Sequence, residues 1–198
     1  MKACLLTVLA GLFISTAIGQ VSFSPVDSKL KTVESNNLSE LICSSPAMSV
    51  KFQLNRKIKV LPQDNFCMID SQAIQVTPLS FSGYRKDSAR LSIDSEKQLL
   101  GAYSKYELEY FKNDLGVEVI NPNNQWVVTK GKGWFIWYFK VGNAPVQVDK
   151  KTFIQLFAST VIGDMVLTIN APILSGGDFA KAGIIVNEMM ETLTIAKP

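Results

Sequence analysis

Histidine is absent from all 198 residues of the chain. A Ser-His-Asp triad, a Cys-His pair and zinc sites that use histidine are therefore excluded. Cysteine is scarce as well: Cys4 lies in the leader described below, and the two that remain cannot build a metal site from thiolates alone. No nucleophile elbow, phosphate-binding loop or aspartate-rich calcium loop occurs. The chain is therefore predicted not to be an enzyme and to need no metal ion or cofactor.

A strong charge of either sign is also missing. The 20 lysine and arginine residues face 17 aspartate and glutamate residues, which leaves a net charge of +3. The densest basic stretches are "RKIK", residues 56–59, and "YRKDSAR", residues 84–90. Nucleic-acid binding typically needs a larger basic excess gathered on one face. We interpret both stretches as solvated surface and predict no nucleic-acid partner.

The N-terminal stretch "MKACLLTVLAGLFISTAIGQ" is apolar but short. Its apolar run, residues 4–14, is too short to cross a bilayer as a helix. Small residues, Ala17 and Gly19, precede a cleavage position at Gln20, which is the layout of a secretory signal. We predict a signal peptide over 1–19, a secreted or periplasmic location and no stable membrane span after cleavage. The alternatives are a membrane anchor and a buried helix.

Two cysteines, Cys43 and Cys67, remain in the processed chain. Thiols of an exported protein meet an oxidising compartment, where a pair commonly forms a disulfide. We therefore predict a disulfide between them. The alternative is that one or both are buried as small apolar side chains.

The pattern along the chain divides it into a polar N-terminal arm, residues 20–48, and a single domain, residues 49–198. The arm shows little periodicity apart from a possible helical turn at "LSELIC". Alternation of apolar and polar residues then predicts two β-hairpins between residues 50 and 76, the second turning at Asp70 and Ser71.

Two amphipathic helices and a set of apolar strands follow. The stretch "IDSEKQLLGAYSKYELEYFKNDLG" predicts a helix with a capping box at Ser95 and a left-handed stop at Gly116. Asp178 is the expected N-cap of a final helix. Between them lie the aromatic strand "WFIWYF" and a long hairpin that turns at Gly163 and Asp164.

These elements predict an α+β fold with an antiparallel sheet of about six to eight strands packed against two main helices. The strands from Trp134 onward are apolar on both faces, so both faces need a cover. We expect the two helices to cover one face. The N-terminal hairpins, a partner or a ligand would cover the other.

The order of the last elements suggests a family. The aromatic strand, the hairpin "VIGDMVLTINAPI" and the closing helix "DFAKAGIIVNEMMETL" together resemble the PsbP-like fold family over about the last third of the chain. The resemblance implies a layered, secreted or lumenal domain and an accessory or interaction role. The metal-contacting histidines of some members have no counterpart here, so the resemblance supplies no site residues.

Two functions remain open. The first is an exported, non-enzymatic binding or accessory protein that presents Trp134, Tyr138, Trp126 and Tyr84 to a protein, a glycan or an apolar ligand, because exposed aromatic residues give a large contact area. The alternative for these residues is burial in the core. The second function is a hydrolase of cell-envelope glycan that uses two carboxylates. Its candidate acids are Asp64, Asp70, Asp87, Asp94, Glu107, Glu109 and Glu118.

Overall fold

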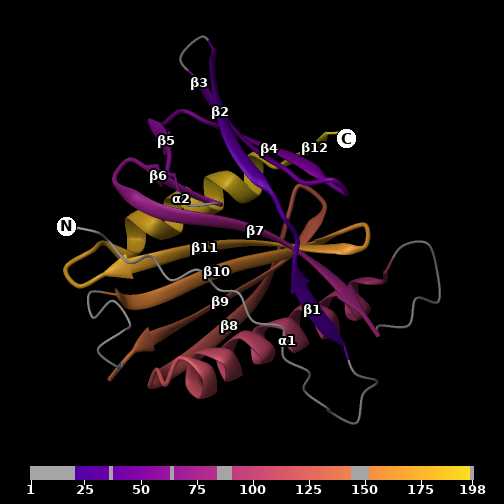
Figure 1. The fold of residues 1–198 in the computed structure, drawn as a ribbon, viewed down its shortest axis with the longest axis vertical. Helices are drawn as coiled ribbons and strands as arrows, with labels where there is room; N and C mark the ends of the chain where they lie inside the picture. The colour runs from indigo at the N-terminus through magenta and orange to yellow at the C-terminus, as the bar shows by residue number, and fades with distance from the viewer. Residues whose placement is uncertain (1–20, 36–37, 63–64, 84–90, 144–151, 197–198) are drawn as a thin grey trace.

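A computed structural model describes residues 21–35, 38–62, 65–83, 91–143 and 152–196. Its main sheet has eight strands, all paired antiparallel (Figure 1). From one edge to the other the strands are β5 (Ile58–Val60), β6 (Phe66–Ile69), β7 (Gln72–Ser82), β11 (Met165–Leu174), β10 (Thr152–Ile162), β9 (Lys132–Val141) and β8 (Val119–Thr129), and β1 (Ser22–Pro25) pairs with β7. With the two helices described below, this confirms the predicted α+β class and the size of the sheet.

A second, smaller sheet extends the fold. Its order is β12 (Thr194–Ala196), β4 (Ser49–Leu54), β3 (Leu38–Ser44) and β2 (Lys29–Ser35). The helical turn predicted at "LSELIC" is wrong, because this segment is β3. Its burial explains the difference: Leu41 and Cys43 are buried and pack into the core beside Phe52 of β4, so the segment gains more as a strand than as a short isolated helix. The predicted signal peptide lies outside the described residues.

Both main helices form where the sequence predicts them. The first helix, α1 (Ile93–Glu109), continues as one π-helical turn, η1 (Tyr110–Asp114), and Gly116 follows it with a φ of 61°. Its N-cap is Ser92, whose hydroxyl accepts the backbone N–H of Ser95 at 3.2 Å, three residues earlier than predicted. The second helix, α2 (Phe179–Thr192), begins after Asp178, whose carboxylate accepts the backbone N–H groups of the first turn, as expected.

The helices lie on opposite faces of the main sheet, which corrects the expectation that both cover one face (Figure 1). Trp134 of β9 packs in a core with α2 and the small sheet, and we name this side the α2 face. Trp137 and Phe139 pack with Phe111 on the side of α1, the α1 face. The physical reason is that both faces of these strands are apolar. A cover of two helices on one side would leave the other exposed to water.

The two faces differ in chemistry. On β11 the residues that face α2 are all apolar, whereas Thr168 and Asn170 on the α1 face are polar and buried. Neighbouring side chains satisfy them: the hydroxyls of Ser159 and Thr168 are 3.1 Å apart, and Asn170 Nδ2 donates to Gln155 Oε1 at 3.0 Å. The centre of the α1 face is thus a band of hydrogen-bonded polar groups beside the stacked rings of Trp137 and Phe157, whose centroids are 3.8 Å apart.

The predicted disulfide between Cys43 and Cys67 is absent, because both cysteines are free and buried. Cys43 lies on β3 of the small sheet and Cys67 on β6 of the main sheet, and both pack into the α2-face core. Burial raises the pKa of the Cys43 thiol to about 11 and that of the Cys67 thiol to about 12. The alternative of small apolar side chains therefore describes both residues.

Candidate functional site

The aromatic residues named as a binding platform do not lie on one surface. Trp134 is fully buried on the α2 face. Tyr138 is half-buried on the same face, where its ring meets Phe179 edge-on at 5.3 Å. Trp126 pairs with Phe135 and packs on the α1 face. Tyr84 lies outside the described residues. The alternation of side chains along β8 and β9 therefore separates Trp126 from Trp134 and Tyr138.

The candidate acids are dispersed. Asp64 and Asp87 lie outside the described residues. Asp94 and Glu118 are exposed, Glu109 is half-buried, and Asp70 forms an ion pair with Arg56 at 2.8 Å. Glu107 alone among the described candidates is buried. In the part of the chain that the structure describes, no group of three or more cysteine and carboxylate side chains could hold a metal ion.

Glu107 belongs to a hydrogen-bonded chain that links α1 to the sheet. Burial raises the pKa of its carboxyl to about 7, and a hydrogen bond with Tyr103 partly offsets that rise. Tyr103, itself buried, also hydrogen-bonds Thr168 of β11, which lies 3.1 Å from the Ser159 hydroxyl of β10. No second carboxyl contributes to the pKa of Glu107. This group therefore holds α1 to the sheet, and it does not form the two-carboxylate geometry of a glycosidase.

The burial of Glu107 is a feature that sequence reasoning missed, although the sequence carries a signal of it. Glu107 follows Tyr103 by four residues and precedes Phe111 by four, so all three lie on one side of the helix. Both aromatic residues are buried, and a carboxyl in line with them must be buried too. The helical spacing of the two aromatic residues therefore predicts which candidate acid is buried.

A shallow pocket of about 530 Å³ lies on the hairpin of β5 and β6. Its lining residues are Lys57, Ile58, Lys59, Met68, Asp70 and Ser71. Lys59 is the cross-strand partner of Met68, so these two side chains lie on the same face of the hairpin. Ile58 alternates with them and packs toward the α2-face core. On its outer face the pocket therefore combines two ammonium groups with the thioether of Met68.

Ion pairs and turn geometry fix the shape of this hairpin. Arg56 donates to Asp70 through Nη1 and to Glu188 of α2 through Nε, and Lys181 Nζ donates to the backbone oxygen of Asp70 at 2.6 Å. The hydrogen bond from Arg56 is the main cause of the lowered pKa of Asp70. Asp70 and Ser71, which connect β6 to β7, both have positive φ, at 47° and 70°, as in a two-residue hairpin turn, which the sequence predicts at this point. The pocket is therefore held by α2 on one side and by a tight turn on the other.

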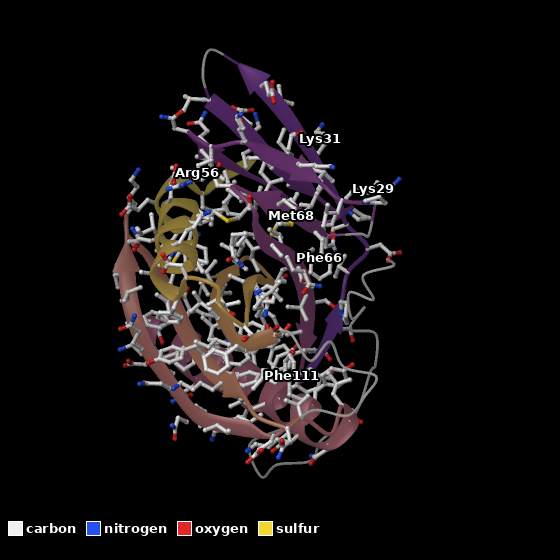
Figure 2. All side chains as sticks on the ribbon, turned by 90° about the vertical axis from the view of Figure 1, so that its left-hand side faces the viewer. Lys29, Lys31, Arg56, Phe66, Met68 and Phe111 are labelled. Atoms are coloured by element: carbon white, nitrogen blue, oxygen red, sulfur yellow. The ribbon has the colours of Figure 1, made fainter. Side chains whose placement is uncertain are left out.

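Four lysines around this pocket have no ion pair with any residue that the structure describes: Lys57, Lys59, Lys29 and Lys31. All four are exposed. The last two lie on β2, which contacts β5, and Leu30 between them packs toward the core, so they point outward. In Figure 2, Lys29, Lys31 and Met68 are labelled in the upper half of the molecule and Phe111 in the lower half. We name these four residues the lysine rim.

Three described acids of the same region are paired with cations outside the rim. Arg56 binds the carboxylates of Asp70 and Glu188, and Lys51 pairs with Glu40. The interpretation of "RKIK" as solvated surface is therefore incomplete, because its lysines border a concavity and a second pair from β2 joins them. That neighbourhood could not be read from a single sequence, because β2 and β5 are far apart along the chain.

Comparisons with known proteins bear on the fold. No family model and no curated protein matches the chain. Among solved structures, the solution structure of cyanobacterial PsbP (CyanoP) from Synechocystis sp. PCC 6803 is similar, with a TM-score of 0.41 and 11% sequence identity over 99% of this chain and 99% of that one. That protein bears the name of the family that the last third of this sequence resembles. Within the described residues, neither helix has the length and apolar character needed to cross a membrane.

Proposed function

We propose that this chain is an exported, non-enzymatic accessory protein that binds an anionic partner at the lysine rim. The observation that carries the proposal is the placement of Lys57 and Lys59 at a pocket whose one lining carboxylate, that of Asp70, is paired with Arg56. Unpaired cations gathered at a concave surface attract an oppositely charged ligand and increase its rate of association.

Two further observations support a binding role over a catalytic one. The buried acid, Glu107, contacts Tyr103 on the α1 face and is absent from the lining of the pocket. The pocket itself holds Asp70 as its one carboxylate among the lining residues, and Arg56 occupies that carboxylate. Carboxylate chemistry of the glycosidase kind needs two free carboxyl groups, and the lining residues offer none.

The proposal predicts that reversing the charge of two rim residues abolishes anion binding. We expect Lys57→Glu combined with Lys59→Glu to weaken the binding of fluorescently labelled poly-L-glutamate at low salt by at least about tenfold, because two attractions become two repulsions. Fluorescence anisotropy titration measures the change. Thermal unfolding of the variant verifies that it is folded, since both side chains are exposed.

The matched control reverses two exposed lysines on the helical segment of the α1 face, Lys105→Glu and Lys112→Glu. This variant has the same net charge as the first, so it should bind the probe as the wild type does if the rim is the site. Equal losses in both variants would mean that overall charge, and not the rim, governs binding. That result would overturn the proposal.

A further inference from the structure

Resting on the proposed function, we infer that the ligand of the lysine rim is an acidic protein segment that carries a large aliphatic residue between its acids and packs that residue against Met68. The exposed part of Met68 is the observation behind this inference. Met68 is half-buried and lies on the same face of the hairpin as Lys59, so part of its side chain remains open to the solvent beside the lysine. A methionine adapts its shape to different apolar partners, and partly exposed methionines are typical of surfaces that bind varied apolar side chains.

The shape of the pocket favours a side chain of a larger molecule over a free small molecule. Its volume of about 530 Å³ falls within the usual range for ligand sites, but those sites bury most of the surface of their ligand. This pocket is shallow and borders open surface on a two-stranded hairpin. One side chain can fill it while the rest of its chain runs over the surface.

The spread of the rim indicates a ligand longer than the pocket. Lys57 and Lys59 line the pocket, whereas Lys29 and Lys31 lie on the neighbouring β2 and not among the lining residues. A ligand that meets both pairs must carry negative charges on either side of the group that enters the pocket. An acidic polypeptide with an aliphatic residue between its acids has this arrangement. Nucleic acid fits less well, because no aromatic side chain lines the pocket to stack on a base.

The test compares two labelled peptides of equal length and charge, one with leucine and one with serine at the centre of a run of aspartate and glutamate. We expect the leucine peptide to bind the wild-type protein about tenfold more tightly, because its side chain leaves water on binding. Met68→Ser should remove this preference and leave the serine peptide unaffected. Met68→Leu, the matched control, should retain the preference. A single-stranded oligonucleotide and phosphatidylcholine vesicles containing phosphatidylserine are titrated under the same conditions.

The outcomes separate the two proposals. If both peptides bind equally and both need Lys57 and Lys59, the inference about the aliphatic side chain is wrong and the proposed function stands. If neither peptide depends on these lysines, the proposed function itself is wrong. If the oligonucleotide or the vesicles bind more tightly than the leucine peptide with the same dependence on the lysines, the partner is not an acidic polypeptide.

Discussion

Trp134→Ala is expected to lower the free energy of unfolding by about 3 to 5 kcal/mol, because the side chain is fully buried and a cavity would replace it. The indole belongs to the core of the α2 face, which also contains residues of α2 and of the small sheet. Denaturant unfolding measures the loss. Trp134→Phe should cost less, because the indole N–H has no hydrogen-bond partner among the described residues and its removal relieves a buried, unsatisfied donor.

The control for this prediction is Trp126→Ala on the opposite face. Trp126 is half-buried, and its ring lies over Gly133 with the Lys97 ammonium 5.4 Å from its centroid. It should lose clearly less stability than the Trp134 variant, since less of its surface leaves water on folding. If Trp134→Ala unfolds like the wild type, Trp134 belongs to an exposed surface and the burial of β9 between α1 and α2 is wrong.

The free energy of unfolding of the wild type is expected to fall as the pH rises through about 7. In Glu107→Gln this fall should be absent. The pKa of the Glu107 carboxyl is about 7 in the folded chain and 4.5 as its ordinary value. Between these values the folded state keeps a proton that the unfolded state has lost. The stabilisation is therefore complete below about pH 4.5 and is lost as the pH rises through about 7, by about 3 kcal/mol in total.

Denaturant unfolding at a series of pH values measures this slope. The difference between wild type and Glu107→Gln isolates the carboxyl from other titrating groups, because those groups are common to both proteins. Glu191→Gln, an exposed position on α2, changes the charge by the same amount and should keep the wild-type slope. A wild type whose stability is the same as that of Glu107→Gln at every pH would show that Glu107 is not buried as described.

Local patterns in the sequence predict much of this fold. The alternation around Phe52 and Ile58 locates the strands β4 and β5, and Asp178 caps α2 as expected. The hairpin predicted from these two strands is wrong, because β4 pairs with β3 in the small sheet and β5 pairs with β6 in the main sheet. The hairpin of β10 and β11 turns at Gly163, whose φ is 59°. These features depend on neighbours along the chain, where the period of apolar residues and the chemistry of turns are sufficient.

Features that depend on distant partners could not be predicted. The segment "NPNNQ", residues 121–125, is rich in asparagine and proline, which are depleted in strands, yet it lies within β8. Its last three residues pair with β9, and the register shifts across Asn121 and Pro122. The side of the sheet that each helix covers is likewise decided by the whole fold. The sequence predicts each helix, and it predicts strands that are apolar on both faces. It does not predict which face of the sheet each helix covers.

In the candidate site, too, local features can be predicted from the sequence and contacts between distant segments cannot. The four rim lysines are visible as the alternating stretches "KLK" and "KIK", each with an apolar residue between two cations. Their meeting around one pocket follows from the contact between β2 and β5, strands of two different sheets. The aromatic residues of β9 suggest a platform in the sequence because they are large and consecutive. Their role is to fill the two cores on either side of the main sheet.

The sharpest test of the binding site is a map of amide chemical shifts in the isotope-labelled protein as the acidic leucine peptide is added. We predict the largest changes at Lys57, Lys59, Met68 and Ser71, with smaller changes at Lys29 and Lys31. Changes that instead gather at Trp126 or Tyr138, with the β5–β6 hairpin unaffected, would contradict a site at the lysine rim.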